Sequence, residues 1–330
     1  MNTLTSNAGK KIIIGGGAGY IGSSLVPAMI ERDYDVTVVD LLWFGNNLPK
    51  DTRIIQKNLF DLSKDELKGF DIFIFLSGLS NDPMAEFSPS KNFIYNAALP
   101  AYLAYIAKQA GVKRYIYASS CSVYGYTENQ LYDEDSPVTC GYPYGISKLQ
   151  GERGVFQIQD DKFSVIALRQ GTVSGYSPRM RFDLIVNTMF KNAVKEGTIT
   201  INNPAIWRPI CDIRDIVSAY IRAIQSPENL NGIFNIASGN YTVGEVGDLV
   251  KIEVEKYSKK KVVLKILNKQ DYRNYKVSIK KAKTNLGFQP IYSIQDTIDG
   301  LFEHQDIYGD FEKDEYYNIR VFKKLENGNF

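Results

Sequence analysis

Residues 11–24 read KIIIGGGAGYIGSS, and this stretch decides the fold. Three β-branched residues in a row, Ile12 to Ile14, predict a short buried strand. The apolar stretch over residues 25–30 predicts a helix shortly after the glycines. The glycines therefore lie between a strand and a helix, where their spacing has a structural meaning.

The glycine spacing in this turn is typical of a dinucleotide site. Gly16 can take the tight turn, Gly19 leaves room for a pyrophosphate against the backbone, and Gly22 lets the helix pack close to the strand. The N–H groups at the helix start, near Tyr20 and Ile21, are expected to meet the phosphates. The alternative is a glycine-rich turn without a ligand.

An acidic residue closes the second predicted strand. Residues 36–39 (VTVV) are β-branched, and Asp40 follows them, 18 residues after Gly22. A carboxylate at about this spacing accepts hydrogen bonds from the adenosine ribose. It also repels a 2′-phosphate, and residues 41–43 supply no arginine to hold one. The sequence therefore favours NAD over NADP; the alternative is an acid that only caps a strand end.

The size and composition of the chain exclude several functions. Its 330 residues suffice for two lobes, and a net charge of +2 gives no strong field toward nucleic acid or a membrane. The first ten residues lack an apolar core, and no apolar run reaches the roughly 18 residues of a membrane span. We expect no signal peptide, no membrane segment and no nucleic-acid partner.

The cysteines and the single histidine limit the chemistry. Cys121, Cys140 and Cys211 lack metal-ligand spacing, which predicts reduced thiols, a cytoplasmic location and no metal site. His304 is the only histidine, so histidine-based triads are nearly excluded. Acid–base chemistry must then use tyrosine, lysine, carboxylates or cysteine.

Strand and helix patterns alternate through the first half of the chain. They predict an α/β fold of the Rossmann type, a doubly wound parallel sheet with helices on both faces. After about residue 174 the pattern loosens, which predicts a smaller, mixed α/β C-terminal substrate lobe. We assign the dinucleotide-binding domain to residues 1–174 plus about 209–238, and the substrate-binding lobe to about 175–208 and 239–330.

Three stretches give specific structural expectations. Residues 90–110 predict a long helix in which Pro100 is a kink or distortion. Residues 181–196 predict a second helix. The last fifteen or so residues, rich in Tyr, Lys and Asn, are expected to form a surface tail or an interface arm.

A tyrosine and a lysine stand four residues apart after a pair of serines. On the predicted helix Tyr144 and Lys148 share a face. The lysine charge favours the phenolate, so we expect it to lower the pKa of Tyr144 and make this phenol a general base or acid. Ser120, at the end of the preceding strand, can hydrogen-bond a substrate hydroxyl. The alternative is a surface pair without a catalytic role.

Three motifs taken together resemble a known family. They are Gly16-Gly-Ala-Gly19-Tyr-Ile-Gly22, Ser119-Ser120-Cys121-Ser122-Val123-Tyr124-Gly125 and Pro143-Tyr144-Gly145-Ile-Ser-Lys148. The combination resembles the extended short-chain dehydrogenase/reductases, which are the NAD-dependent nucleotide-sugar epimerases and dehydratases. The stretches 208–215 (RPICDIRD) and 286–290 (LGFQP) are similar to later motifs of that family, so the resemblance covers nearly the whole chain.

The resemblance implies roles for individual residues. Ser120, Tyr144 and Lys148 would be the catalytic residues, with Tyr144 and Lys148 also contacting NAD. Asn58 and Leu59 fall where the family contacts adenine. The second lobe would bind a nucleotide-diphosphate sugar.

The same resemblance implies the substrate contacts. Arg208 and Arg273 fall where the family holds the substrate diphosphate, and Ser120, Cys121 and Ser122 fall beside the sugar. Sugar 4,6-dehydratases carry an acidic pair at the positions of Cys121 and Ser122, and decarboxylases usually keep a glutamate at Ser122. Without these carboxylates, elimination lacks its acid and base.

The remaining chemistry is oxidation and reduction at a sugar carbon. The main interpretation is a nucleotide-sugar 4-epimerase that works through a 4-keto intermediate. The alternative is a C4 dehydrogenase or a 4-ketoreductase, and less weight falls on a 4,6-dehydratase, a decarboxylase or a non-catalytic dinucleotide-binding protein.

The family commonly forms homodimers through helices equivalent to 90–110 and 145–159, and a homodimer is expected here. Apolar or aromatic residues recur at helical spacing along the first of these helices, where they serve the core or the interface: Tyr95, Leu99, Tyr102, Leu103 and Ile106.

Overall fold

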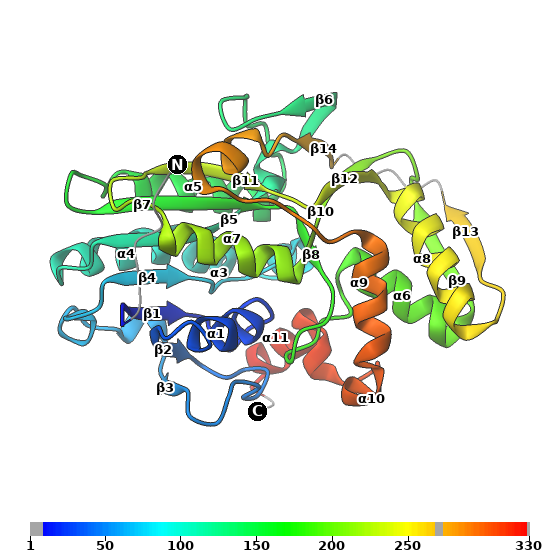
Figure 1. The fold of residues 1–330 in the computed structure, drawn as a ribbon, viewed down its shortest axis with the longest axis horizontal. Helices are drawn as coiled ribbons and strands as arrows, with labels where there is room; N and C mark the ends of the chain where they lie inside the picture. The colour runs from blue at the N-terminus through cyan, green and yellow to red at the C-terminus, as the bar shows by residue number, and fades with distance from the viewer. Residues whose placement is uncertain (1–8, 268–272, 329–330) are drawn as a thin grey trace.

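The computed structural model describes residues 9–267 and 273–328 and has two parts (Figure 1). The larger part is built on a seven-stranded sheet, and the smaller is grouped around helices α6 (Ile185–Glu196), α8 (Val243–Ser258) and α9 (Ile294–Glu303). None of the helices in these described ranges is long and apolar enough to cross a membrane.

The large sheet has the strand order β11-β7-β5-β4-β1-β2-β3, and each neighbouring pair is parallel. Its strands are β1 Lys11–Gly15, β2 Asp35–Asp40, β3 Arg53–Gln56, β4 Ile72–Phe75, β5 Arg114–Ser120, β7 Ser164–Gln170 and β11 Gly232–Ile236. The strand order changes direction beside β1, and such a switch point leaves a crevice at the carboxyl ends of the strands. The predicted Rossmann-type fold is confirmed.

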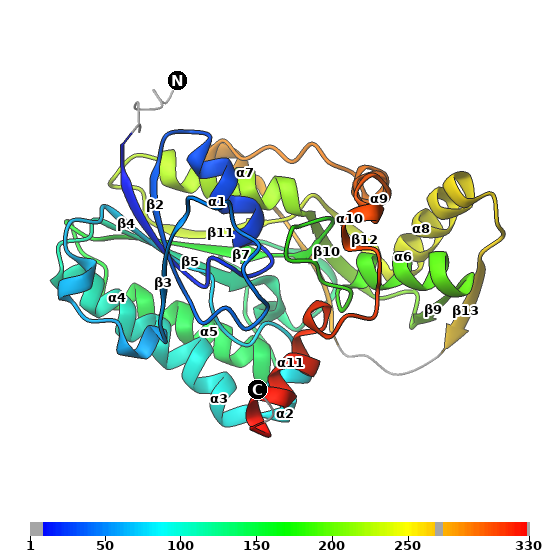
Figure 2. The ribbon, with the colours of Figure 1, turned by 90° about the horizontal axis from the view of Figure 1, so that it is seen from below.

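Helices cover both faces of this sheet (Figure 2). The main ones are α1 Gly22–Ile30, α4 Leu99–Gln109, α5 Pro143–Phe156 and α7 Ile213–Gln225. Ile12 and Ile14 belong to the core cluster that also contains residues of α1 and α7, and Ile13 belongs to the cluster that contains residues of α4 and α5. Three apolar residues in a row thus reflect a strand that is buried on both faces.

The remaining strands are short and lie outside the large sheet. The other strands are β6 Tyr126–Tyr132, β8 Thr172–Ser174, β9 Thr198–Asn202, β10 Trp207–Asp212, β12 Gly239–Thr242, β13 Val263–Leu267 and β14 Asn274–Val277. They form a sheet β12-β10-β8 and the pairs β13-β9 and β14-β6. The core of the smaller part includes Phe182, whose ring meets the rings of Tyr308, Phe311 and Tyr316 edge-on, with centroids 5.0 to 5.6 Å apart.

Short helical segments complete the chain. They are η1 Leu59–Asp61, η2 Asp65–Leu67, α2 Asp82–Phe87, α3 Pro89–Phe93, η3 Ile94–Ala98, η4 Cys121–Tyr124, η5 Ala282–Leu286, α10 Gln305–Tyr308, η6 Asp314–Tyr316 and α11 Asn318–Glu326. Of these, η3 and η5 are π-helical.

The two predicted helices differ from the observed ones at their boundaries. Residues 90–110 form α3, the π-helical η3 and α4 in succession, and Pro100 lies in the first turn of α4, where a missing N–H costs little. The helix predicted over 181–196 begins only at Ile185, because Arg181 and Asp183 before it form an ion pair in an irregular loop.

The C-terminal segment does not run as a free surface tail through the described residues, so that part of the expectation is wrong. It ends in helix α11, whose Phe322 is fully buried and packs against Leu79 and Met84. The ring of Phe322 also stacks on Trp43, with centroids 6.1 Å apart. Helix α11 therefore lies on the larger part, beside α2, as Figure 2 also shows.

Candidate active site

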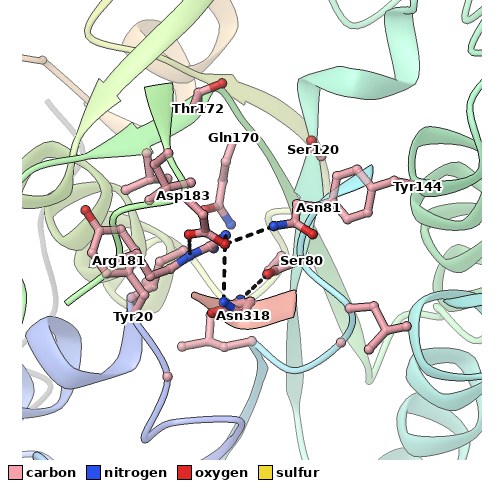
Figure 3. Close-up of a pocket in the computed structure, with 18 of the residues that line it drawn as sticks. Tyr20, Ser80, Asn81, Ser120, Tyr144, Gln170, Thr172, Arg181, Asp183 and Asn318 are labelled. Carbon is pink, nitrogen blue, oxygen red and sulfur yellow. Dashed lines mark hydrogen bonds and ion pairs between the residues drawn. The ribbon is translucent and has the colours of Figure 1, made fainter. Parts of the chain in front are cut away.

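A cavity of about 660 Å³ opens at the carboxyl ends of β1, β2, β4 and β5. It extends into the smaller part, since residues of α6 and β10 also line it. All the predicted site residues except Cys121 line this one cavity: Gly16, Gly19, Tyr20, Ile21, Gly22, Asp40, Asn58, Leu59, Ser120, Ser122, Tyr144, Lys148, Arg208 and Arg273. Figure 3 shows ten of the lining side chains by name.

The glycine turn has the shape that the sequence predicts for a dinucleotide site. Gly16 has φ +81°, and a Cβ there would lie 2.7 Å from the backbone of Ser77, two residues after β4. A Cβ on Gly22 would lie 2.1 Å from the carbonyl oxygen of Gly17, so the helix start needs glycine. At Gly19 a Cβ would meet only one backbone oxygen, at 3.3 Å, which leaves this side of the turn open for a ligand.

Asp40 stands at the end of β2 beside this turn. Its carboxylate accepts hydrogen bonds from the backbone N–H of Ala18 at 3.0 Å and of Leu42 at 2.8 Å. Burial raises the pKa of Asp40, while these N–H groups act in the opposite direction. Asn58 caps η1 through its bond from the Phe60 N–H, and Leu59 packs beneath the turn. The residues present thus fit a dinucleotide whose phosphates lie over the turn and whose ribose faces Asp40.

Ser120, Tyr144 and Lys148 come together on the other side of the cavity. Ser120 is the last residue of β5 and caps η4, while Tyr144 and Lys148 lie in the first two turns of α5. The Lys148 ammonium nitrogen donates to the carbonyl of Ala118 at 3.0 Å and lies 5.9 Å from the ring centroid of Tyr144. Ser122 donates from its hydroxyl to Oγ of Ser120 at 2.9 Å.

Burial shifts both catalytic pKa values. It raises the pKa of Tyr144 above that of an ordinary phenol; the Asp82 carboxylate raises it further, and a hydrogen bond with Ser120 acts in the opposite direction. Burial lowers the pKa of Lys148 to about 7. The prediction that Lys148 lowers the pKa of Tyr144 is therefore wrong for the chain itself, because the loss of solvation outweighs a lysine that is only partly charged near neutral pH.

A buried ion pair joins the elements that carry Ser120, Tyr144 and Lys148. Nη2 of Arg169 lies 2.6 Å from Oε1 of Glu152, and Nε of Arg169 lies 2.9 Å from Oε2. Glu152 also accepts from the Ser119 hydroxyl at 2.7 Å, and Arg169 donates to the Tyr124 hydroxyl at 2.8 Å. The pair therefore links α5 to β5 and β7 and fixes Lys148 and Ser120 relative to each other.

The two predicted phosphate-binding arginines meet at the rim of the cavity. Arg208 on β10 donates to the carbonyl groups of Trp207 and Arg273. Arg273 forms an ion pair with Asp82 at 2.6 Å, which ties it to α2. Both side chains line the cavity on the side of the smaller part.

Cys121 does not contact the cavity, so its prediction as a substrate contact is wrong. Its thiol is fully buried and donates to the carbonyl oxygen of Arg169 at 3.1 Å. The cause is the turn of the chain into η4 after Ser120, which points the next side chain into the core while Ser122 faces the cavity.

Sequence reasoning missed a polar cluster on the cavity wall, centred on Asp183 (Figure 3). Asp183 pairs with Arg181 at 2.8 Å, accepts from the Asn81 amide at 3.1 Å and accepts from the backbone N–H of Asn318 at 3.4 Å. Arg179, Arg181, Asp183 and Asn318 all line the cavity. The available signal was the alternation of charges at 179, 181 and 183 in a segment without regular structure.

The fold and site define a class of protein, a dinucleotide-dependent oxidoreductase with a tyrosine–lysine–serine site. More narrowly, the chain belongs to the NAD dependent epimerase/dehydratase family, whose model matches residues 12–237. The predicted family is confirmed, and so are the predictions of an enzyme and of NAD as its cofactor.

Relatives with assigned functions match most of the chain. A putative UDP-glucose 4-epimerase of Methanocaldococcus jannaschii is 27% identical over 87% of this chain and 95% of its own length. UDP-glucose 4-epimerase 3 of Oryza sativa is also 27% identical, over 88% of each chain. A solved UDP-glucuronic acid 4-epimerase from Bacillus cereus shares the fold, with a TM-score of 0.78 over 90% of this chain and 99% of that chain, at 22% identity.

Proposed function

We propose that this enzyme is a nucleotide-sugar 4-epimerase. The observation that carries the proposal is that one cavity holds the dinucleotide turn and the Ser120–Tyr144–Lys148 group but offers no uncommitted carboxylate in the described residues. Its acidic lining residues are Asp40, Asp82 and Asp183. Asp40 accepts from two backbone N–H groups, and the other two form ion pairs with arginines.

This arrangement supports redox chemistry over elimination. A dehydratase needs a carboxylate that can take and give protons beside the sugar. The positions after Ser120 hold a buried thiol and a hydroxyl, and the hydroxyl of Ser122 is directed at Ser120. The relatives named above are 4-epimerases by their names, and UDP-hexoses are therefore the first substrates to test.

The mechanism follows from the residues in the cavity. Tyr144 takes the proton of the C4 hydroxyl at its phenol oxygen and returns it to the C4 oxygen when hydride reaches the opposite face of the C4 carbon. Ser120 donates a hydrogen bond to the C4 oxygen while negative charge develops there, and Lys148 stabilises the phenolate when it carries its proton. NAD, when bound, would supply the acceptor for the C4 hydride and the hydride for the opposite face of the carbonyl carbon, and its positive ring would favour the phenolate. Arg208 and Arg273 hold the substrate diphosphate.

The proposal is tested with UDP-hexoses that carry deuterium at C4. The purified enzyme, without added cofactor or electron acceptor, should give an isomer of unchanged mass that keeps its deuterium at C4. Tyr144→Phe, the matched control, should bind the nucleotide sugar but lose about 10³-fold in turnover. A product lighter by 18 mass units would identify a dehydratase, and turnover that requires an external acceptor would identify a C4 dehydrogenase.

We also propose a two-domain division and a homodimer that works in the cytoplasm in carbohydrate biosynthesis. Residues 1–174 plus about 209–238 would form the NAD-binding domain, and about 175–208 and 239–330 the nucleotide-sugar lobe, with helix α11 packing back on the former. The three cysteines are free, in keeping with a reducing compartment.

The exposed face of α4 supports the dimer. Tyr102 and Tyr105 on α4 are 47% and 52% exposed, whereas Leu99, Leu103 and Ile106 are buried in the core. Size-exclusion light scattering should give a dimer for the wild type and a monomer for Tyr105→Glu; a monomeric wild type at micromolar concentration would contradict the dimer.

A further inference from the structure

Arg179 is a buried cation on the cavity wall that the proposed mechanism does not use. It lies in the loop between β8 and α6, is 3% exposed and lines the cavity. Its guanidinium carbon lies 3.7 Å from the ring centroid of Phe44, so the plane of the guanidinium is fixed by stacking. Nη2 donates to Oδ1 of Asn318, the first residue of α11.

Two other nitrogens of this guanidinium lack a hydrogen-bond partner among the described residues. Nε and Nη1 of Arg179 are buried, and no residue in the described ranges accepts a hydrogen bond from either. The two nearest carboxylates are already engaged, Asp183 by Arg181 and Asp40 by two backbone N–H groups. Burial lowers the pKa of Arg179 to about 9, and the charge of Arg181 acts in the same direction. A buried cation with two donors that lack acceptors destabilises the folded protein unless an anion accepts hydrogen bonds from them.

The position of Arg179 identifies which anion this is. The loop that carries Arg179 is fastened to the glycine turn, because the Tyr20 hydroxyl donates to the carbonyl of Gly175 at 2.6 Å and the Ser177 hydroxyl donates to the carbonyl of Tyr20 at 2.7 Å. Phe44, the stacking partner, follows the strand that ends in Asp40. Arg179 therefore belongs to the dinucleotide side of the cavity, whereas the substrate diphosphate is assigned to Arg208 and Arg273.

We propose that Arg179 binds the diphosphate of NAD through the N–H groups of Nε and Nη1, and that Asn318 of helix α11 is the residue that positions it. The phosphates would then be held on one side by the backbone of the glycine turn and on the other by a planar cation. A planar guanidinium presents N–H groups in fixed directions on more than one side, so it can donate to separate phosphate oxygens, whereas a lysine ammonium is a single compact charge.

The contacts of helix α11 hold Arg179 in place. Besides accepting from Arg179, Asn318 donates from its amide to Oγ of Ser80 at 2.5 Å, and its backbone N–H contacts Asp183. Four residues later Phe322 packs between Trp43 and Phe87, with ring centroids 6.1 and 5.9 Å away. These contacts join the segment after β2 to the segment after β4, so α11 bridges the two sides of the dinucleotide half of the cavity.

The test measures binding, so its result does not depend on which sugar is the substrate. The full-length protein is stripped of nucleotide, and isothermal titration gives the Kd of NAD, of ADP-ribose and of UDP added to NAD-loaded protein. Arg179→Gln should raise the Kd of NAD and of ADP-ribose by roughly 10- to 100-fold, the range for losing hydrogen bonds to a charged group. UDP binding should change by less than about twofold. Arg179→Lys should lie between the wild type and Arg179→Gln. The matched control is Arg320→Gln, a half-buried arginine of α11 that pairs with Glu312 and Asp314 and does not line the cavity.

Asn318→Ala separates positioning from general stability. It should raise the Kd of NAD by about 3- to 10-fold in the wild-type background and have no further effect in Arg179→Gln, because the two residues act through one contact. If Asn318 only stabilised the helix, the melting temperature would fall while the Kd at 10 °C stayed constant, which would refute its positioning role.

Other outcomes assign the arginine elsewhere and overturn the proposal. Loss of UDP binding with an unchanged NAD affinity would place Arg179 at the substrate diphosphate. A wild type that binds NADP as tightly as NAD, with only NADP binding weakened by Arg179→Gln, would place it at a 2′-phosphate. A wild type that binds no dinucleotide would refute this proposal and the proposed function together, whereas bound NAD without epimerisation would refute only the latter.

Discussion

Lys148 is a buried lysine whose charge opposes folding, and Lys148→Met tests this directly. Methionine keeps an unbranched chain of similar length but removes the ammonium group and its bond to the Ala118 carbonyl. The variant should lose turnover, because Lys148 supports the Tyr144 phenolate. It should also be more stable than the wild type near neutral pH.

The magnitude follows from the pKa of Lys148, which burial lowers from 10.5 to about 7. In the unfolded chain the lysine keeps its proton up to about pH 10.5, whereas in the folded protein it loses the proton above about pH 7. The folded state thus binds fewer protons between these two pH values, and wild-type stability rises with pH across this window. At about 1.4 kcal/mol for each pKa unit, the cost is about 5 kcal/mol well below pH 7, about 4 at pH 7 and about 2 at pH 9.

The assay is urea unfolding of both proteins at pH 7 and pH 9. The stability advantage of Lys148→Met should shrink by about 2 kcal/mol between these pH values, and any constant effect of methionine packing cancels in this difference. Lys50→Met, at an exposed lysine, is the control and should show no such change. An advantage that stays constant or grows with pH would refute the reasoning.

Three further predictions concern the support of the site. Glu152→Gln should cost about 3 to 5 kcal/mol in the free energy of unfolding, since it leaves Arg169 buried without its counter-charge; an effect below about 1 kcal/mol in denaturant unfolding would contradict this. Gly22→Ala should lower the free energy of unfolding by about 2 kcal/mol or more and weaken NAD binding, because its Cβ meets the Gly17 carbonyl. Gly300→Ala, with open space around it, is the control and should be neutral or slightly stabilising in the same melts. Cys121→Ala should leave kcat/KM within about twofold and cost about 1 kcal/mol of stability. Iodoacetamide should not label Cys121 in the folded wild type, because the thiol is buried and burial raises its pKa. Rapid labelling, or a large loss of kcat/KM, would show that Cys121 belongs to the substrate site.

The parts of the site that the sequence could predict depend on local patterns. A strand, three spaced glycines, a helix and an acid at the end of the next strand specify the dinucleotide turn within 30 residues. The spacing of Tyr144 and Lys148 on one helix works in the same way. Parallel strands then bring these segments to one edge of the sheet, so their meeting in a single cavity follows from the fold.

The parts that could not be predicted depend on distant contacts or on one residue's direction. Arg179 meets Asn318 across 139 residues of sequence, and no spacing rule connects them. Cys121 and Ser122 are neighbours, yet a short 3₁₀ turn points one into the core and the other into the cavity. The pKa of Tyr144 depends on how completely the folded chain excludes water from the phenol. The four-residue spacing between Tyr144 and Lys148 carries no information about that burial.

The docking of helix α11 also has a consequence for the order of events during synthesis. Phe322 packs against Trp43, a partner made 279 residues earlier, and Asn318 and Ile319 complete the wall of a cavity whose floor is encoded near residue 16. At typical translation rates of about 5 to 20 residues per second, that separation amounts to tens of seconds. A growing chain that has not reached α11 lacks Asn318 and Ile319, so the cavity seen in this structure is complete only after that helix has been made.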